Sequence, residues 1–157
     1  MKNKKIKMLV IAILVPLVIG FVSYLLTKDN IQNYSENVVK PALTPPTILF
    51  PIVWTILYVL MGISSYRVFV SKNLSSQNAL LVYVIQLFFN FFWSIIFFNL
   101  KAYLVAFVWL VIMIILIAIM VLKFYKIDKL AGILQIPYLL WSLFAAYLNF
   151  NVYLLNM

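Results

Sequence analysis

Five long stretches without a charged residue limit what this chain can fold into. They cover residues 8–27, 41–66, 73–100, 102–122 and 130–157. Each reaches or exceeds the roughly 20 residues that a helix needs to span a hydrocarbon core of about 30 Å. With 67% hydrophobic and 10% charged residues, the composition also lies outside that of water-soluble domains. The sequence therefore predicts a protein that crosses a membrane five times.

These stretches favour helices over strands, because they are continuously apolar and do not alternate with polar residues. We predict an all-α membrane protein, a five-transmembrane-helix bundle that forms a single domain over residues 1–157. The apolar segment after Lys7 is longer than the roughly 7–15 residues of a signal-peptide core, and no small-residue cleavage site follows it, so we expect it to be retained. The predicted helices cover about 7–26, 46–69, 79–98, 102–125 and 130–155.

Prolines and one polar segment mark the ends of these helices. Pro16 predicts a bend in the first helix. Pro46 suits the first turn of the second helix, and Pro137 interrupts the fifth. The polar connection over residues 27–44 is longer than most connections in compact bundles, which is typical of a disordered or functional segment. We regard this connection as a candidate lid.

Positive charge is concentrated on one side of the predicted bundle. The net charge is +9, and only Lys28, Lys40 and Lys101 fall on the side away from the N-terminus. The other cations are Lys2, Lys4, Lys5, Lys7, Arg67, Lys72, Lys123, Lys126 and Lys129. The positive-inside rule therefore predicts a cytoplasmic N-terminus and an external C-terminus. Contact with anionic lipid explains these cations without nucleic acid.

Several reactive residue types are missing from the chain. It has no cysteine and no histidine, and Asp29, Glu36 and Asp128 all lie in predicted connections. Disulfides and thiolate chemistry are excluded. No metal site is predicted, and the usual axial ligands of a strongly bound haem iron are absent. Because ion-coupled transporters keep ionisable groups inside the membrane, that class is disfavoured.

Three predicted helices each carry aromatic and polar side chains on one face, at spacings of three and four residues. The second, third and fifth helices contribute Trp54, Tyr58, Met61 and Ser65; Gln86, Asn90, Trp93 and Phe97; and Tyr138, Trp141, Ala145 and Asn149. In the fourth helix, Trp109 alone can form a side-chain hydrogen bond between Val105 and Leu122, which is typical of lipid exposure or plain packing.

One interpretation of these faces is purely structural. Amides are costly in lipid unless they are paired, so Gln86, Asn90 and Asn149 must face inward. There they can simply tie helices together, each with about 0.6–2 kcal/mol. The small residues within the segment 142–146 likewise suit a close contact between helices.

The other interpretation is a ligand pocket. Trp54, Trp93 and Trp141 share their faces with polar groups, which favours a cavity over anchors at the membrane surface. Apolar walls with a few oriented polar groups are typical of small-molecule sites. Because indole and phenol rings stack on flat molecules, the three faces predict a site for a planar hydrophobic ligand.

The same residues belong to three longer motifs. They are Lys40-Pro41…Pro45-Pro46…Phe50…Val53-Trp54…Leu57-Tyr58…Met61-Gly62…Tyr66, then Gln86-Leu87…Asn90…Trp93-Ser94…Phe97-Phe98, then Pro137-Tyr138…Trp141…Phe144-Ala145…Leu148-Asn149…Leu155-Asn156. In this order and spacing, the motifs resemble the tryptophan-rich sensory protein family (TspO/MBR). That family includes the mitochondrial translocator protein, also called the peripheral benzodiazepine receptor. The resemblance covers nearly the whole chain.

The resemblance implies a five-helix bundle that is usually a homodimer in the lipid bilayer. It also implies a pocket beneath the first connection that binds tetrapyrroles such as protoporphyrin and benzodiazepine-type ligands, with no required cofactor. By position, the ligand-binding residues would be Pro45, Pro46, Trp54, Tyr58, Asn90, Trp93, Tyr138, Trp141, Ala145 and Asn149. Lys40, beside the proline rim, is a candidate partner for ligand carboxylates. We expect the protein in a bacterial cell membrane.

Two positions depart from the family pattern. Leu43 lies between the two proline groups, where family members often have a tryptophan, so the lid lacks this aromatic side chain. No lysine or arginine follows Tyr153, so the weak cholesterol-recognition pattern is incomplete. Sterol handling is therefore not supported.

The leading hypothesis is a membrane receptor or carrier for a planar hydrophobic ligand, with a metal-free tetrapyrrole as the first choice. The alternative is an enzyme that degrades porphyrin in a light-dependent or oxidative reaction. Trp54 and Trp141 would then act on the ligand, and no acid–base residue would be needed. A purely structural membrane subunit would leave the three aligned faces unexplained.

Overall fold

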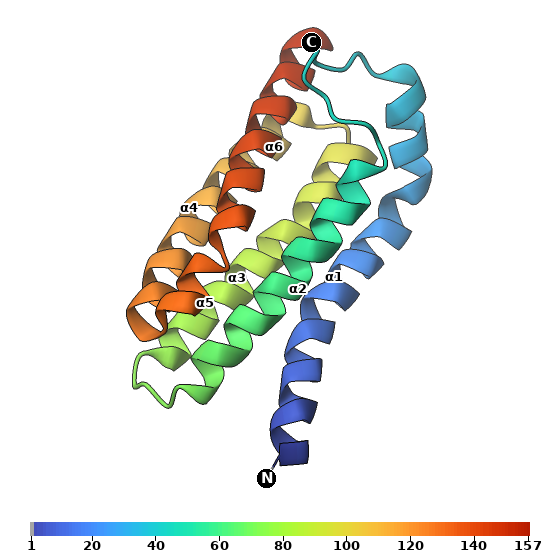
Figure 1. The fold of residues 1–157 in the computed structure, drawn as a ribbon. Helices are drawn as coiled ribbons and strands as arrows, with labels where there is room; N and C mark the ends of the chain where they lie inside the picture. Colours follow the sequence, from blue (N-terminus) through green and yellow to red (C-terminus); the bar gives the residue numbers. More distant parts are fainter. Residues whose placement is uncertain (1) are drawn as a thin grey trace.

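The computed structural model describes residues 2–157, with side chains from Asn3 onward, and contains no strand in this range (Figure 1). Its elements are α1 (Lys2–Asn37), α2 (Leu49–Val70), α3 (Ser76–Ser94), the π-helical turn η1 (Ile95–Asn99), α4 (Tyr103–Ile127), α5 (Lys129–Ile133) and α6 (Ile136–Leu155). Together they supply five helical segments long and apolar enough to cross a membrane. The predicted all-α, five-helix membrane architecture is confirmed.

The largest difference from the predicted helix ends concerns α1. This helix begins at Lys2 and continues to Asn37, so most of the predicted lid is helical and only residues 38–48 connect α1 to α2. Asn30 Nδ2 donates to Asn99 Oδ1 at 3.0 Å, and Asn99 Nδ2 donates to the Leu26 carbonyl at 3.0 Å. The polar side chains of this segment therefore attach the end of α1 to η1. The polar residues that follow Thr27 end the apolar stretch of the sequence, but the α1 helix continues through them to Asn37.

The three prolines singled out in the sequence have different effects on the helices. Pro16 lies inside α1, which stays helical through it. The second helix begins at Leu49 and not at Pro46, because residues 46–49 form a turn in which the Leu49 amide donates to the Pro46 carbonyl at 2.9 Å. The fifth predicted helix is divided into α5 and α6 just before Pro137, as the sequence indicated.

Most helices pack against their neighbours along the bundle (Figure 1). α1 packs on α2 and α3, α3 packs on α4, and α4 packs on α6, while α5 contacts α2 and α4. We call the end of the bundle that holds the N-terminus the N-terminal end, and the opposite end, where the chain finishes, the C-terminal end. The 38–48 connection lies at the C-terminal end, near the C-terminus (Figure 1).

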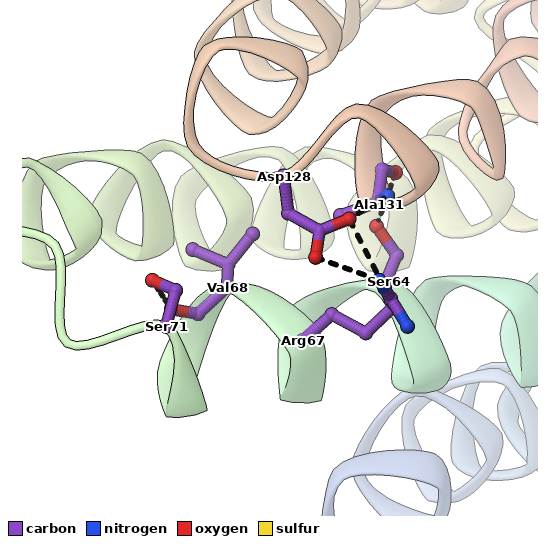
Figure 2. A network of polar contacts seen from close by, with 6 residues as sticks. All are labelled: Ser64, Arg67, Val68, Ser71, Asp128 and Ala131. Carbon is purple, nitrogen blue, oxygen red and sulfur yellow. Dashed lines mark hydrogen bonds and ion pairs between the residues drawn. The ribbon is translucent and has the colours of Figure 1, made fainter.

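At the N-terminal end, an ion pair joins α2 to the turn between α4 and α5 (Figure 2). Arg67 binds Asp128 through two hydrogen bonds, Nη2–Oδ2 at 2.7 Å and Nε–Oδ1 at 3.1 Å. Asp128 Oδ1 also accepts from the Ala131 amide at 2.9 Å and so caps α5. The Ser64 hydroxyl donates to the Ala131 carbonyl at 2.6 Å. These contacts hold α2 and α5 together.

The hydrogen-bonded Arg67 guanidinium holds the pKa of the Asp128 carboxyl below its usual value of 3.8. Because the folded-state pKa is depressed, the pair stabilises the fold above the unfolded-state pKa, and this stabilisation is lost as the pH falls through the lower folded-state pKa. The Arg67 side chain is 37% exposed, so solvent screens the pair and its contribution is small.

We expect Asp128→Asn to lower the melting temperature at neutral pH by an amount equivalent to less than about 1 kcal/mol, because asparagine can keep the α5 cap through Oδ1 but loses the charge and one of the two hydrogen bonds from Arg67. The difference between wild type and variant should shrink as the pH falls below about 4. Thermal unfolding of the purified protein in detergent across this pH range measures it. A difference that stays constant with pH would contradict the assignment.

Close packing of α1 on α2 depends on Gly62. A Cβ at this position would collide with the Ile13 backbone and would lie 2.7 Å from the Ala12 carbonyl oxygen. Backbone atoms of a packed helix cannot move aside cheaply, so only glycine allows this approach. The small residue thereby sets the distance between the first two membrane helices.

We expect Gly62→Ala to destabilise the fold by about 1–3 kcal/mol, through overpacking at the α1–α2 contact. Loss of secondary structure on heating, followed by circular dichroism in detergent, measures the effect. Val70→Ile is the matched control, because it adds one methylene to the same helix at a position that is 39% exposed. Equal melting temperatures for the two variants would refute the close approach.

Candidate ligand site between helices α2, α3 and α6

A chain of hydrogen bonds between neutral side chains joins α2, α3 and α6. The Tyr58 hydroxyl donates to Asn90 Oδ1 at 2.8 Å. Asn90 Nδ2 donates to the Tyr138 hydroxyl at 3.1 Å, and this hydroxyl donates to Gln86 Oε1 at 2.8 Å. All four residues are buried, Gln86 and Tyr138 almost completely. We call these four residues the neutral network.

Trp54 lies against this network on the side of α2. Its ring centroid is 5.5 Å from that of Tyr58 and 6.1 Å from that of Tyr138. Gly20 of α1 leaves room for the Tyr58 ring, since a Cβ there would collide with the ring. The position of the Tyr58 hydroxyl therefore depends on three helices.

A second polar group lies nearer the C-terminal end. Trp93 Nε1 donates to Asn149 Oδ1 at 3.1 Å, and Asn149 Nδ2 donates to the Tyr103 carbonyl at 2.8 Å. The Trp93 ring stacks on Phe97 with 5.3 Å between centroids, and Phe97 in turn contacts Tyr34 of α1 at 5.3 Å. Both bonding groups of Asn149 are thereby used to tie α3, α4 and α6 together. For Asn149 the geometry agrees with the interpretation that buried amides tie helices together.

A groove runs between α2 and α6. It has a volume of about 400 Å³ and is lined by Val53, Ile56, Leu57, Pro137, Leu140, Trp141 and Phe144. Ile56 and Leu140 are more than half exposed, so the groove opens onto the outer surface of the bundle. The Trp141 ring lies between Phe50, at 5.9 Å, and Phe144, at 5.7 Å. Its walls are therefore apolar and rich in aromatic surface.

Polar contacts hold the bundle together at both ends of α2 and α6. At the N-terminal end, α2 is held to α5 by the Arg67–Asp128 pair. At the C-terminal end, Asn156 Nδ2 donates to the Val39 carbonyl at 2.9 Å, and the Val39 amide donates to Asn156 Oδ1 at 3.1 Å. This pair of bonds attaches the 38–48 connection to the end of α6. The groove itself opens on the side of the bundle.

The sequence-predicted residues separate into several environments. Trp54, Tyr58, Asn90 and Tyr138 meet at the neutral network, and Trp141 lines the groove beside it. Trp93 and Asn149 form the second polar group, and Ala145 packs against the core. Pro45 and Pro46 lie in the 38–48 connection and are absent from the groove lining. Lys40 lies there too, where its Nζ donates to the Ser35 carbonyl at 2.7 Å.

Some residues that shape the site were missed by sequence reasoning. Gln86 was on a predicted face but was left out of the predicted ligand-binding set, although it ends the neutral network. Tyr103 contributes a backbone carbonyl, which no side-chain pattern reveals. Ile56 and Leu140 line the groove. In an apolar helix, nothing in the sequence distinguishes a residue that lines a groove from one that faces lipid. The motif ending in Asn156 was the one available hint of its contact with Val39.

Five membrane-spanning helices around an uncharged site of aromatic and amide side chains define a polytopic α-helical membrane protein with a neutral intramembrane site. Residues 12–155 match the model of the TspO/MBR family. The chain therefore belongs to the TspO/MBR family, and the predicted resemblance is confirmed.

Individual relatives support the same assignment over nearly full length. The chain is 36% identical over 156 residues to the tryptophan-rich protein TspO of Chlorobaculum tepidum, covering 98% of this chain and 99% of the relative. It is 38% identical over 148 residues to the TspO protein of Archaeoglobus fulgidus, covering 94% and 96%. The translocator protein of Sus scrofa is 32% identical over 143 residues, covering 89% and 85%.

Proposed function

We propose that this protein is a membrane receptor or carrier that binds a planar hydrophobic ligand, foremost a tetrapyrrole such as protoporphyrin, in the groove between α2 and α6. The observation that carries this proposal is the aromatic groove, whose lining residues Leu57 and Pro137 are chain neighbours of Tyr58 and Tyr138 in the neutral network. Benzodiazepine-type ligands share the flat apolar shape and suit the same walls. The names of the relatives, which include a translocator protein, fit a role in handling such a ligand.

Binding in the groove would rest on stacking and on shape. The Trp141 and Phe144 rings offer flat apolar surface to a macrocycle, and Trp54 contacts the Tyr58 and Tyr138 rings of the neutral network. The network contains only neutral groups, so it can orient a polar edge of the ligand without burying a charge. The carboxylates of a porphyrin would remain at the C-terminal end, where the exposed Lys40 is available.

We extend the proposal to the setting of the protein. The cations of α1, of the turn after α2 and of the turn after α4 gather at the N-terminal end, so this end would face the cytoplasm and the C-terminal end the outside. Relatives from bacteria and archaea suit a cell membrane as the location. A homodimer is the expected assembly, on the basis of the family resemblance.

Trp141→Ala should weaken protoporphyrin binding by about 2- to 10-fold, since one aromatic contact contributes about 0.5–1.5 kcal/mol beyond its buried area. Titration of the purified protein with protoporphyrin, followed by quenching of tryptophan fluorescence, measures this affinity. Trp109→Ala is the matched control, because Trp109 stacks on Phe89 at 4.3 Å and bonds to its carbonyl, apart from the groove. Equal affinities for the wild type and Trp141→Ala would refute the groove as the site.

A second candidate function is light-dependent or oxidative breakdown of the porphyrin, with dissolved dioxygen as the oxidant. The observation in its favour is the contact of Trp54 with Tyr58 and Tyr138, which places oxidisable rings in a row behind the groove. Such chemistry would need no acid–base residue. In this second function the bound porphyrin is a substrate, whereas in the first it is transported or sensed.

Illumination of the protein with protoporphyrin distinguishes the two functions. An enzyme should convert the porphyrin to a discrete product under air, and Trp54→Phe and Trp141→Phe should lower the rate while leaving the affinity nearly unchanged. A receptor should show only the bleaching seen in detergent alone. Absorbance spectra and chromatography of the extracted pigment provide the readout, and the same samples kept in darkness or under argon are the controls.

A further inference from the structure

Several buried polar atoms next to the neutral network have no hydrogen-bond partner in the protein. Within the described part of the chain, they include both amide atoms of Gln135, Nε2 of Gln86 and the hydroxyl of Tyr83, which has the Ser65 hydroxyl nearby as a further polar group. Gln86 and Gln135 are 0% exposed and Tyr83 is 5% exposed. Leaving one such group unpaired costs about 1–3 kcal/mol. A primary amide can donate two hydrogen bonds and accept two, so several possible hydrogen bonds of the Gln135 side chain are not made within the protein.

Tyr83 and Gln135 lie at a similar depth in the bundle, one helical turn from Gln86 and Tyr138. Gln135 comes three residues before Tyr138, and Tyr83 comes three residues before Gln86, so each lies one helical turn from the Tyr138–Gln86 hydrogen bond of 2.8 Å. α3 and α6 both run from the N-terminal end to the C-terminal end. Both steps therefore lead toward the N-terminal end, which places Tyr83 and Gln135 on the same side of the Tyr138–Gln86 hydrogen bond.

The surroundings of this region restrict what can bind there. On the α4 side, Phe124 lies 6.1 Å from the Tyr83 ring, and Met113 and Met120 are almost completely buried. Toward the N-terminal end, the Arg67–Asp128 pair and the Ser64–Ala131 bond close the bundle (Figure 2). An ion would need a buried counter-charge, and the amides and phenol are neutral. A small neutral molecule that both donates and accepts hydrogen bonds meets these conditions.

We propose that Tyr83, Gln86 and Gln135 enclose a buried hydration site, in which water completes the hydrogen bonds of the two amides and the phenol. A buried water typically makes two to four hydrogen bonds, which is the number of partners that these side chains supply. The water extends the neutral network from Tyr58 through Gln86 to Gln135. The site thereby fixes the orientation of the Gln86 amide, and through it the position of the Tyr138 hydroxyl in the neutral network.

X-ray radiolytic labelling of the full chain in detergent, performed in isotopically labelled water, tests this site. Hydroxyl radicals formed from a bound water oxidise the side chains beside it, even where bulk solvent does not reach. Tyr83 should be oxidised several-fold more than Phe97, which is equally buried at 4% exposure. Oxidation of Tyr83 no greater than that of Phe97 would overturn the proposal and would favour direct contact between the Gln86 and Gln135 amides.

Gln135→Leu provides a comparison in which the reporter residue stays the same. The leucine fills much of the same volume and removes the amide, so Tyr83 oxidation should fall several-fold relative to the wild type. Unchanged oxidation in a variant with a wild-type circular dichroism spectrum would show that Gln135 does not hold the water and would overturn the assignment. If the variant does not fold, the wild-type comparison of Tyr83 with Phe97 decides the question.

Discussion

The need to pair every polar group without help from bulk water governs this structure. A backbone or side-chain group left unpaired in a hydrocarbon layer costs several kcal/mol, so the chain satisfies its backbone within helices and pairs the amides of Asn90 and Asn149 between them. Asn90 illustrates the result, since its oxygen accepts from Tyr58 and its nitrogen donates to Tyr138. One amide thereby sets the relative positions of α2, α3 and α6, and the groove between α2 and α6 depends on that spacing.

The two sides of α2 show opposite solutions to helix packing. Toward α1, Gly62 removes the side chain and lets the backbones approach closely. Toward α6, large side chains such as Ile56 and Trp141 keep the helices apart and line a groove. The ion pair at one end and the Val39–Asn156 bonds at the other hold the helix ends while the middle stays open to the side. A hydrophobic ligand dissolved in lipid could reach such an opening without crossing water.

The four tryptophans show that the role of a side chain depends on its surroundings in the folded protein. Trp54 lies beside the neutral network, and Trp141 lines the groove. Trp93 bonds to Asn149 within the second polar group, and Trp109 stacks on Phe89. The spacing in the sequence predicted which tryptophans share a face with polar groups, but it could not separate a ring that borders a groove from one that ties helices together.

The sequence by itself determined the five membrane helices, the membrane class and the family, because uncharged length and motif order are local properties that lipid enforces directly. It also determined that Gln86, Asn90 and Asn149 are buried, since amides are not tolerated against lipid. Only the tertiary structure decided that α1 continues to Asn37 and that the groove lies between α2 and α6. Those features arise from contacts between residues far apart in the chain, such as Asn30 with Asn99, and apolar periodicity carries no information about which helices become neighbours.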